Sequence, residues 1–474
     1  SDSPDSQTYN FTTQTEALET ITNLTSGFTA SDTTATTPIT ANSTVSVDVS
    51  GGGYTLTDDG SGVLSAASLP VSGTINYNYN VEWKRCKNFT IAGQTAPEGG
   101  ITIQAAGAGF WQCDNIIVRY LRFVNRSYFI DRTTRATLQA SGTTNAMFDH
   151  LSFRYSHNSL AFTAQDDTVP QGGLTLQRSI IADNHTGVIV GSIVTNPRIF
   201  NAGDNTVHHN LFVHVDHRMP SVAGNGNADI IENYVYNPGS RISMFFNNSN
   251  SNLINNTWRY GSASFNGITK NKIGDYVDVT NGDTPRVYMA GNRLDSSNNS
   301  YDHLPTDTAM APIFSIWETV GTAENVTPSA ADEAEFRANT EFPSLGVPVT
   351  RLGTDAAVTS ILADVGANAY LNGNGSVGAY LDTNDAEYIG DATNNVCTSC
   401  QPNGALANKT DISQLNYPVL PSNTRDTNYD SDNDVMPDEW ERTKFGDLTR
   451  DGTGDFDGDQ YTVLEEFLNL VDFN

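Results

Sequence analysis

The chain has 474 residues, with 25 Lys and Arg against 54 Asp and Glu, a formal net charge of −29 and an isoelectric point near 4.4. This acidity argues against binding to nucleic acid or to an anionic membrane, because either partner requires a basic surface. Only 38% of the residues are hydrophobic, yet 19 Tyr and 21 Phe are present, which favours a large all-β protein of short strands over a disordered chain. No apolar run of about 18 residues occurs, so no membrane-spanning helix is expected.

Residues 1–80 are rich in Thr and Ser. We expect them to form an N-terminal cap that covers the open edge of the structure that follows, since an uncovered parallel edge would aggregate. The chain opens directly on polar residues at Ser1. We therefore expect a secreted, extracellular protein whose signal peptide has already been removed, and we expect it to act as a monomer.

A repeat of 23 residues defines the middle of the chain. Asn210, Asn233 and Asn256 each precede a short apolar segment, and Asn292 continues the pattern after an insertion. A short repeat with a recurrent turn asparagine is typical of a right-handed parallel β-helix, in which asparagine side chains bond from coil to coil. We predict coils from residue 81 to about residue 330, within a catalytic domain of residues 81–425 that includes wrapping loops.

The region after the coils is harder to interpret. Residues 330–341 have a helical pattern, and the segment that continues to residue 425 is rich in turns. The sequence leaves open whether this segment completes the helix or returns along it.

Four cysteines favour an oxidising compartment. Cys86 and Cys113 begin similar segments 27 residues apart, and stacked strands would hold their Cα atoms about 4.8 Å apart, within the range of a disulfide. We predict that these two are bonded. Cys397 and Cys400 form a single CxxC pair, for which a small disulfide loop is a better interpretation than a zinc site.

Residues 426–474 predict an EF-hand-like module with two calcium loops. Each loop has aspartates at positions one, three and five and a glutamate at position twelve, which is the spacing of oxygen ligands around Ca²⁺. Val435 and Gln460 replace the usual glycine at position six. We predict a structural role for this calcium. The predicted ligands are Asp430, Asp432, Asp434, Asp438 and Glu441 in the first loop, and Asp455, Asp457, Asp459 and Glu466 in the second.

Short motifs lie at residues 90–97, 115–121, 148–150 and 209–220. In their sequence and their order they resemble the pectate lyase superfamily, and bacterial members of polysaccharide lyase family one more closely. The resemblance implies a parallel β-helix that cleaves an acidic polysaccharide by β-elimination. It also implies that Arg218, in the Arg-x-Pro motif, is the base that removes the C5 proton.

The sequence departs from the family where catalytic calcium would be held. The carboxylates expected on either side of the Asp-His element are replaced by residues 134–136 and 156–158, which read Thr-Arg-Ala and Ser-His-Asn. Catalytic calcium is therefore doubtful. Arg135, His157 and Asn158 could neutralise a substrate carboxylate instead, as basic and amide side chains do in calcium-independent relatives.

The asparagine register predicts a groove without reference to the family. Arg218 and Arg241 each lie eight residues after a repeat asparagine, so we expect them on adjacent coils. His157, His185 and Asp216 each lie six residues after the corresponding position of their own coil. A column of such side chains suits a chain that bears carboxylates.

Elimination needs a group that neutralises the uronate, a base, and a proton donor for the leaving oxygen. Arg241, with His157 or Asn158, is the predicted neutraliser. Arg218 is the base by resemblance, while His185 and His217 are alternative bases because histidine titrates near neutrality.

The leading hypothesis is a secreted lyase acting on a uronic-acid polysaccharide, with a glucuronate-bearing or sulfated algal polymer as the favoured substrate. A pectate lyase acting on polygalacturonate is the alternative within that class. A glycoside hydrolase would need clustered aspartates, for which Asp149, Asp183 and Asp216 are candidates. A third hypothesis is a β-helix that binds carbohydrate without cleaving it.

Overall fold

A computed structural model describes residues 81–398 and 425–470 with internal gaps, together with four strands within residues 1–80. The gaps are residues 97–99, 104–107, 125–135, 164–168, 192–201, 240–241, 262–273, 278–283, 296–299, 305–313 and 318–326. Among the described residues, no helix combines the length and apolar character needed to cross a bilayer.

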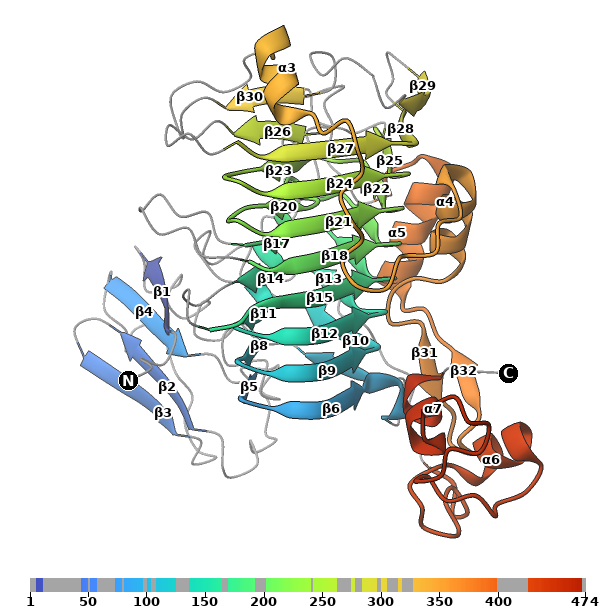
Figure 1. Ribbon diagram of the computed structural model, residues 1–474. Coiled ribbons are helices and arrows are strands. Elements are labelled where there is room, and N and C mark those ends of the chain that lie inside the picture. The colour runs from blue at the N-terminus through green and yellow to red at the C-terminus, as the bar shows by residue number, and fades with distance from the viewer. Residues whose placement is uncertain are drawn as a thin grey trace.

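The central body is a right-handed parallel β-helix of three sheets, as predicted (Figure 1). Sheet 1 contains β5 (Val81–Lys84), β8 (Ala108–Trp111), β11 (Ala136–Ser141), β14 (Asn158–Thr163), β17 (Thr186–Val190), β20 (Ser221–Val222), β23 (Ser243–Phe245), β26 (Gly274–Val277) and β30 (Phe314–Trp317). Sheet 2 contains β6 (Lys87–Ala92), β9 (Asp114–Arg119), β12 (Thr144–Asp149), β15 (Gly172–Gln177), β18 (Asp204–His208), β21 (Asn227–Ile231), β24 (Asn250–Ile254) and β27 (Arg286–Ala290).

Sheet 3 completes each coil. It contains β7 (Ile101–Ile103), β10 (Leu121–Val124), β13 (Ser152–Arg154), β16 (Ile180–Ala182), β19 (Leu211–Val213), β22 (Tyr234–Tyr236), β25 (Thr257–Arg259), β28 (Asn292–Asp295) and β29 (Ser300–Leu304). All neighbouring strands of the three sheets are parallel except β28 and β29, which pair antiparallel. The described coils therefore extend from Val81 to Trp317, close to the predicted limits.

An asparagine ladder joins the coils at the turn between sheets 2 and 3. The side-chain oxygen of Asn233 accepts a hydrogen bond from the backbone N–H of Asn210 at 3.1 Å, and Asn256 and Asn292 continue the same pattern at 2.9 Å. The residue before each asparagine has a positive φ, +53° at both His209 and Glu232. This left-handed residue makes the sharp turn, and the asparagine satisfies the backbone that the turn leaves unpaired.

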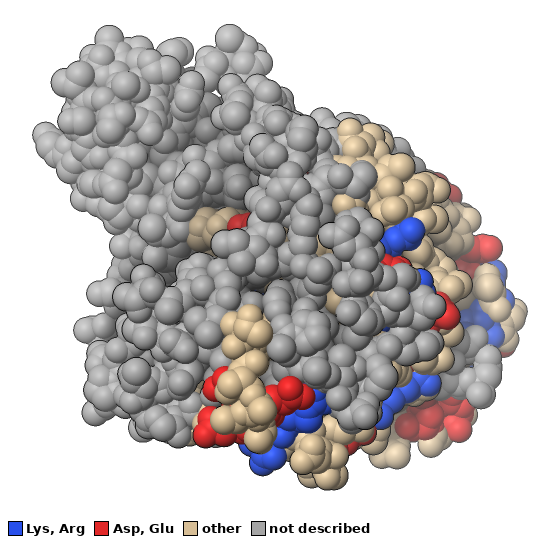
Figure 2. Space-filling model, turned by 90° about the horizontal axis from the view of Figure 1, so that it is seen from above, with Lys and Arg blue, Asp and Glu red and all other residues tan. Residues whose placement is uncertain are grey.

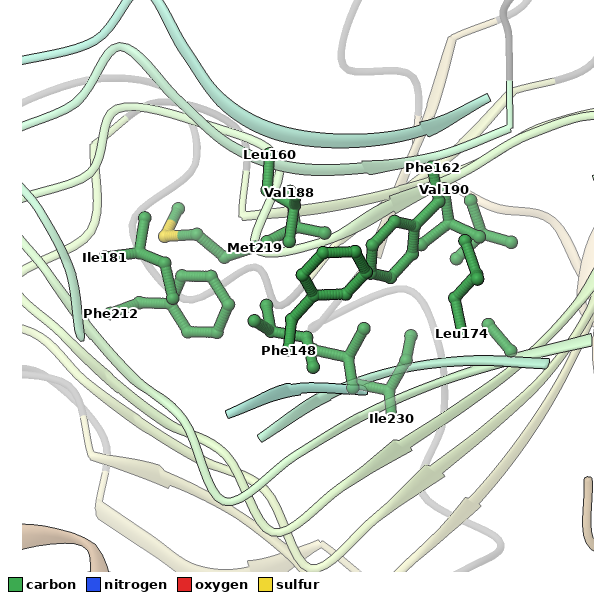
Figure 3. Close-up of a cluster of buried hydrophobic side chains, with 14 of the residues drawn as sticks. Phe148, Leu160, Phe162, Leu174, Ile181, Val188, Val190, Phe212, Met219 and Ile230 are labelled. Atoms are coloured by element: carbon green, nitrogen blue, oxygen red, sulfur yellow. The ribbon is translucent and has the colours of Figure 1, made fainter. Parts of the chain in front are cut away.

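The interior of the helix is filled by stacked apolar side chains from all three sheets. Figure 3 shows Phe148 of sheet 2 beside Phe162 of sheet 1, with Ile181 and Phe212 of sheet 3 on the opposite side. The rings of Phe148 and Phe162 have centroids 5.5 Å apart. Met219 also points into this core and is almost fully buried, which fixes the backbone next to Arg218.

The described part of the N-terminal region is a separate antiparallel sheet. Its strands are β1 (Ser6–Phe11), β2 (Thr44–Val49), β3 (Gly52–Thr57) and β4 (Gly73–Asn78), in the order β1-β4-β2-β3. Figure 1 shows this sheet beside the end of the β-helix that begins with β5. Its role as a cap remains a prediction.

After the last coil the chain returns along the outside of the β-helix, which answers the question that the sequence left open. Helix α3 (Ala330–Phe336) begins with a capping box at Ser329. Residues 343–398, which we call the strap, then run back along the outside of the β-helix, first over sheet 2 and then beside sheet 3 (Figure 1). The strap contains α4 (Thr354–Ala363), β31 (Ala369–Leu371), β32 (Val377–Ala379) and α5 (Thr383–Asn394).

Polar contacts attach the strap to one coil after another. The backbone N–H of Gly353 donates to Glu232, Asp364 contacts His150 at 3.1 Å, and Asp382 pairs with Arg154 at 2.7 Å. The α5 helix also packs Tyr388 and Ala392 against the outer face of sheet 3. Asp382 and Arg154 are both buried, and each has a second charged partner, Arg122 for Asp382 and Asp385 for Arg154.

The C-terminal module contains α6 (Asp438–Phe445) and α7 (Val463–Asn469) and contacts the first coil. Gln94, in the short helix η3 (Gly93–Thr95), donates a hydrogen bond to the carbonyl of Leu468 at 2.7 Å, and Arg119 donates to the carbonyl of Asn469. The two ends of the described β-helix region are thus linked by the returning chain.

The predicted bond between Cys86 and Cys113 is wrong, because both are free thiols. The two residues do occupy equivalent positions on adjacent coils, since the N–H of Asp114 donates to the carbonyl of Cys86. Their sulfur atoms instead contact backbone carbonyls, Lys84 for Cys86 and Trp83 for Cys113. Burial raises the pKa of the Cys113 thiol. The bond predicted for Cys397 stays a prediction, because Cys400 lies outside the described residues.

Candidate active site and calcium sites

The predicted groove residues lie at the turn that leads from sheet 3 into sheet 1. Asn158 of β14 is paired with Thr186 of β17, and Thr186 forms a parallel bridge with His217 on the next coil. The residues one position earlier, His157, His185 and Asp216, therefore stack on one another. This is the column that the asparagine register predicted.

Side-chain distances confirm the stacking. The rings of His157 and His185 lie parallel with centroids 4.5 Å apart, and the ring of His217 meets that of His185 edge-on at 4.3 Å. The Nε2 atom of His185 and the Nδ1 atom of His217 each lie 3.4 Å from Oδ2 of Asp216. Two imidazoles and one carboxylate thus converge on one point of the turn.

Thr186 lies behind the two histidines. Its hydroxyl oxygen is 3.2 Å from Nε2 of His217 and 3.4 Å from Nδ1 of His185. The hydroxyl therefore contacts the ring nitrogen of each histidine that faces away from Asp216, and it fixes the orientation of both rings.

Arg218 follows directly, and its backbone is held in an uncommon conformation. Its φ is +63°, and its carbonyl accepts a hydrogen bond from Val188 at 2.7 Å. A non-glycine residue in this region is strained and persists only where its surroundings require it. The buried side chain of Met219 anchors the next position, so the arginine is presented from a fixed turn.

Two glycines that the sequence analysis did not single out shape this turn. A Cβ atom on Gly187 would lie 2.6 Å from the carbonyl oxygen of Arg218, and one on Gly239 would lie 2.6 Å from the Cα atom of Asp216. Both contacts are closer than real Cβ atoms tolerate. A glycine within a strand or turn pattern marks a close approach of two backbone segments. These two glycines were therefore the feature of the sequence that could have indicated the shape of this turn.

Burial and the charges of neighbouring groups keep the imidazole of His185 neutral. Burial, together with the neighbouring imidazoles of His217 and His157 and the guanidinium of Arg218, lowers the pKa of His185 to about 3. The carboxylate of Asp216 opposes this shift without reversing it. At neutral pH the ring therefore offers a lone pair and carries no charge.

The described residues do not include every predicted site residue. Arg135 and Arg241 lie outside the described residues. Near Arg241, Ser221 pairs with Met244, which is the predicted offset of 23 residues. Asn158 is only 5% exposed, so a polymer could not contact much of it.

The aspartates proposed for hydrolysis do not come together. Asp149 and Asp183 are both buried at the turns that face the strap. Asp149 pairs with Arg119 and His150, and Asp183 accepts a hydrogen bond from the hydroxyl of Tyr388 at 2.9 Å. Only Asp216 of the three belongs to the histidine column, so a hydrolase with paired carboxylates is not supported.

The C-terminal loops gather most of the predicted calcium ligands. Ligand oxygens lie within 4.8 Å of one another in three groups, namely Asp430 with Asp432 and Asp438, Asp432 with Asp434 and Glu441, and Asp455 with Asp457 and Asp459. Val435 and Gln460 both have a φ of +82°, the left-handed conformation for which an EF-hand loop uses glycine. Glu466 is buried on α7.

The environment of these carboxylates fits a bound cation. Both carboxylate oxygens of Glu441, one of Asp434 and one of Asp459 are buried and accept no hydrogen bond from the described residues. Burial and the charges of Asp434, Asp432, Asp438 and Asp430 raise the pKa of Glu441 to about 7. Oxygen ligands in this number and spacing suit Ca²⁺.

On the face seen from above, Lys and Arg side chains lie interspersed with Asp and Glu among the described residues (Figure 2).

Comparison with known proteins identifies fungal relatives. A probable pectate lyase C from Aspergillus terreus is 28% identical over 300 residues, which cover 60% of this chain and 68% of that protein. A probable pectate lyase C from Neosartorya fischeri is 27% identical over 297 residues, which cover 60% and 67%. No protein-family model matches the chain.

Solved structures show a more distant likeness. Pectate lyase II from Xanthomonas campestris has a TM-score of 0.42 and 14% identity, covering 60% of this chain and 78% of that one. Pectate lyase C from Erwinia chrysanthemi, studied with 30 mM Ca²⁺, has a TM-score of 0.39 and 15% identity, covering 61% and 75%. In sequence, the chain is thus similar to fungal proteins described as probable pectate lyases.

Proposed function

We propose that the protein is a polysaccharide lyase that cleaves a uronic-acid polysaccharide by β-elimination. The relatives named as pectate lyases support an enzyme of the lyase class that acts on polysaccharides. The observation that carries the proposal is the column of His157, His185, Asp216 and His217 beside Arg218, at one turn of the β-helix. A polymeric substrate also favours work outside the cell, where we propose that the protein acts as a monomer.

The proposed chemistry removes the proton from C5 of a uronate and expels the glycosidic oxygen from C4, leaving a C4–C5 double bond. Arg218 is the proposed base. A guanidinium ordinarily keeps its proton, so a base of this kind requires neighbouring positive charge and exclusion of water. His185 and His217 are the alternative bases, and either could protonate the leaving oxygen. Arg241, with His157 or Asn158, is the proposed neutraliser of the substrate carboxylate.

Our proposal for the identity of the uronate rests on the absence of carboxylates from two segments of the sequence. The segments at residues 134–136 and 156–158 contain no carboxylates, whereas the family members that use catalytic calcium hold it there. A glucuronate-bearing or sulfated polymer is therefore our first proposal, and polygalacturonate is the second. We propose that the calcium of the C-terminal module is structural, because that module contacts the first coil rather than the histidine column.

The test is to incubate the full-length protein with a panel of acidic polysaccharides and to follow the ultraviolet absorbance of the unsaturated uronate product. The panel should include polygalacturonate, a glucuronate-bearing polymer and a sulfated algal polymer. Product absorbance with any of them supports a lyase, and the best substrate identifies the uronate. New reducing ends without that absorbance would indicate a hydrolase, and binding without cleavage would indicate a carbohydrate-binding protein.

A further inference from the structure

The point where His185, His217 and Asp216 converge has the geometry of a metal site. Nε2 of His185 and Nδ1 of His217 each lie 3.4 Å from the same carboxylate oxygen, Oδ2 of Asp216, and the three ligand atoms lie within 4.8 Å of one another. Each side chain thus directs one lone-pair atom at a shared position.

The spacing suits a metal better than direct hydrogen bonds. A charge-assisted N–H···O bond has a length of about 2.7–2.9 Å, and both contacts with Asp216 are longer. Zinc binds nitrogen and oxygen at about 2.0–2.1 Å, so neighbouring ligands of a tetrahedron lie about 3.3–3.4 Å apart. The two distances of 3.4 Å to Asp216 match that separation.

The contacts behind the ligands agree with this assignment. A histidine that binds a metal through one ring nitrogen commonly donates a hydrogen bond from the other, which fixes its tautomer. Here the outer nitrogens of both histidines contact the hydroxyl of Thr186, at 3.2 and 3.4 Å. A hydroxyl oxygen has two lone pairs and can accept from both rings. Both inner nitrogens would then be unprotonated and face Asp216.

We propose that His185, His217 and Asp216 bind a divalent transition metal of the zinc type, with a fourth coordination position open to the groove. The side chains of His185, Asp216 and His217 are 31%, 23% and 10% exposed, so solvent reaches the site. Three protein ligands and one open position are typical of catalytic rather than structural zinc.

The open position suits an anionic oxygen. Asp216 is the only anionic ligand of the three, and the guanidinium of Arg218 is near enough to lower the pKa of His185. The bound ion would keep a net positive charge that attracts a carboxylate. If the proposed lyase function holds, on which this step rests, the ion takes the place of catalytic calcium and binds the uronate carboxylate. The two histidines are then ligands, which leaves Arg218 as the base.

The experiment uses the full chain with excess Ca²⁺ to fill the C-terminal loops, and Co²⁺ as the probe. Tetrahedral cobalt with nitrogen ligands absorbs visible light strongly, whereas cobalt in an oxygen-ligated calcium loop absorbs weakly. We expect strong absorption that saturates at one equivalent and that Zn²⁺ abolishes by competition. His217→Gln and His185→Gln should each lose it.

His214→Gln is the matched control, because His214 belongs to a different group of potential ligands with Asp391 and Cys397. This variant should keep the cobalt spectrum, and thermal melting should show that all three variants remain folded. A wild-type chain without the strong absorption, or a spectrum lost in His214→Gln and kept in His217→Gln, would overturn the proposal.

The outcome is separable from that of the proposed function. A cobalt spectrum in a protein that cleaves no uronate polymer would leave the metal site standing and remove the lyase. Addition of galacturonate or glucuronate should shift the cobalt spectrum of the wild type, since a carboxylate replaces water at the fourth position. An unchanged spectrum at saturating uronate would refute the substrate-binding part.

Discussion

Arg218 combines a strained backbone with a position beside the histidine column. Replacement by Lys keeps the positive charge but removes the planar guanidinium and displaces the nitrogen that would receive the proton. We expect Arg218→Lys to lower turnover by at least about a hundredfold, because small misplacements of a reacting group cost that much. Steady-state kinetics on the best polymer measures this.

The exposed Arg286 on β27 provides the control, and Arg286→Lys should have nearly wild-type turnover. The cobalt spectrum should survive in Arg218→Lys, since the arginine is not a ligand. Near-normal turnover of Arg218→Lys would contradict the role of base that the family resemblance implies for Arg218.

His150 predicts a pH dependence of stability. Burial of the His150 imidazole lowers its pKa. The negative charges of Asp149 and Asp364 and the hydrogen bonds to these two carboxylates have the larger effect, and they raise the pKa above 6.5. A raised pKa in the folded state means that the stabilisation is fully present below about pH 6.5. It is lost as the pH rises through the folded-state pKa.

Replacing His150 by Gln should therefore destabilise the protein more at pH 6 than at alkaline pH. The measurement is the midpoint of denaturant unfolding of wild type and His150→Gln at several pH values. A difference that stays constant from pH 6 to alkaline pH would show that His150 contributes by packing alone.

At the scale of elements, the asparagine ladder is the feature through which the sequence repeat most directly determines the structure of each coil. Asn233 is buried, accepts from the backbone of Asn210, and donates to the carbonyl of Val207 at 2.8 Å. Each buried polar group left without a partner costs about 1–3 kcal/mol. We expect Asn233→Ala to lower the free energy of unfolding by about 3 kcal/mol.

Asn227 offers a matched comparison on the same coil, because its amide also bonds across coils, to Asp204 at 2.7 Å, but at an exposed position. Asn227→Ala should change stability by less than about 0.5 kcal/mol. Equal losses in the two variants, measured by denaturant unfolding, would mean that burial of the ladder contributes little.

The sequence predicted the coils well because the ladder requires one residue type at one place in every coil. The same register predicted the stacking of His157, His185 and Asp216. The register failed for Cys86 and Cys113, which are free thiols, because spacing fixes the Cα positions of a stacked pair but does not decide whether the two neighbouring sulfur atoms are bonded.

Other features could not be read from periodicity. Gly187 is one of many glycines in the sequence, and only the folded backbone shows that Arg218 presses against it. The path of the strap depends on pairs such as Arg154 with Asp382, which are 228 residues apart and share no repeat. Contacts of this kind become visible only when distant segments are placed side by side.

At the scale of the whole molecule, the calcium module is attached to the first coil and does not stand apart. Calcium at about 100 times its dissociation constant would stabilise the folded module by about 2.7 kcal/mol. We expect its removal by a chelator to increase hydrogen exchange in α6 and α7, and also in β6, whose coil contacts Leu468 through Gln94.

Strands β18, β21 and β24, in the middle of sheet 2, should keep their protection against exchange. Asp457→Asn should reproduce the effect of chelation without a chelator, because Asp457 belongs to the group of oxygen ligands in the second loop. Unchanged exchange in α6 and α7 after calcium removal would contradict a structural role for the ion.

The hydrogen bond between Gln94 and Leu468 joins residues that are 374 positions apart in the sequence. This separation determines how long a newly synthesised chain waits before the bond can form. At a synthesis rate of about 5–20 residues per second, the first coil would wait about 20–75 s for its last contact. During that interval the strands of the first coil are held only by pairing with their neighbouring strands, or they remain unfolded. We therefore expect export to be easier before the C-terminus is synthesised. The first coil should become more stable once Gln94 bonds to Leu468.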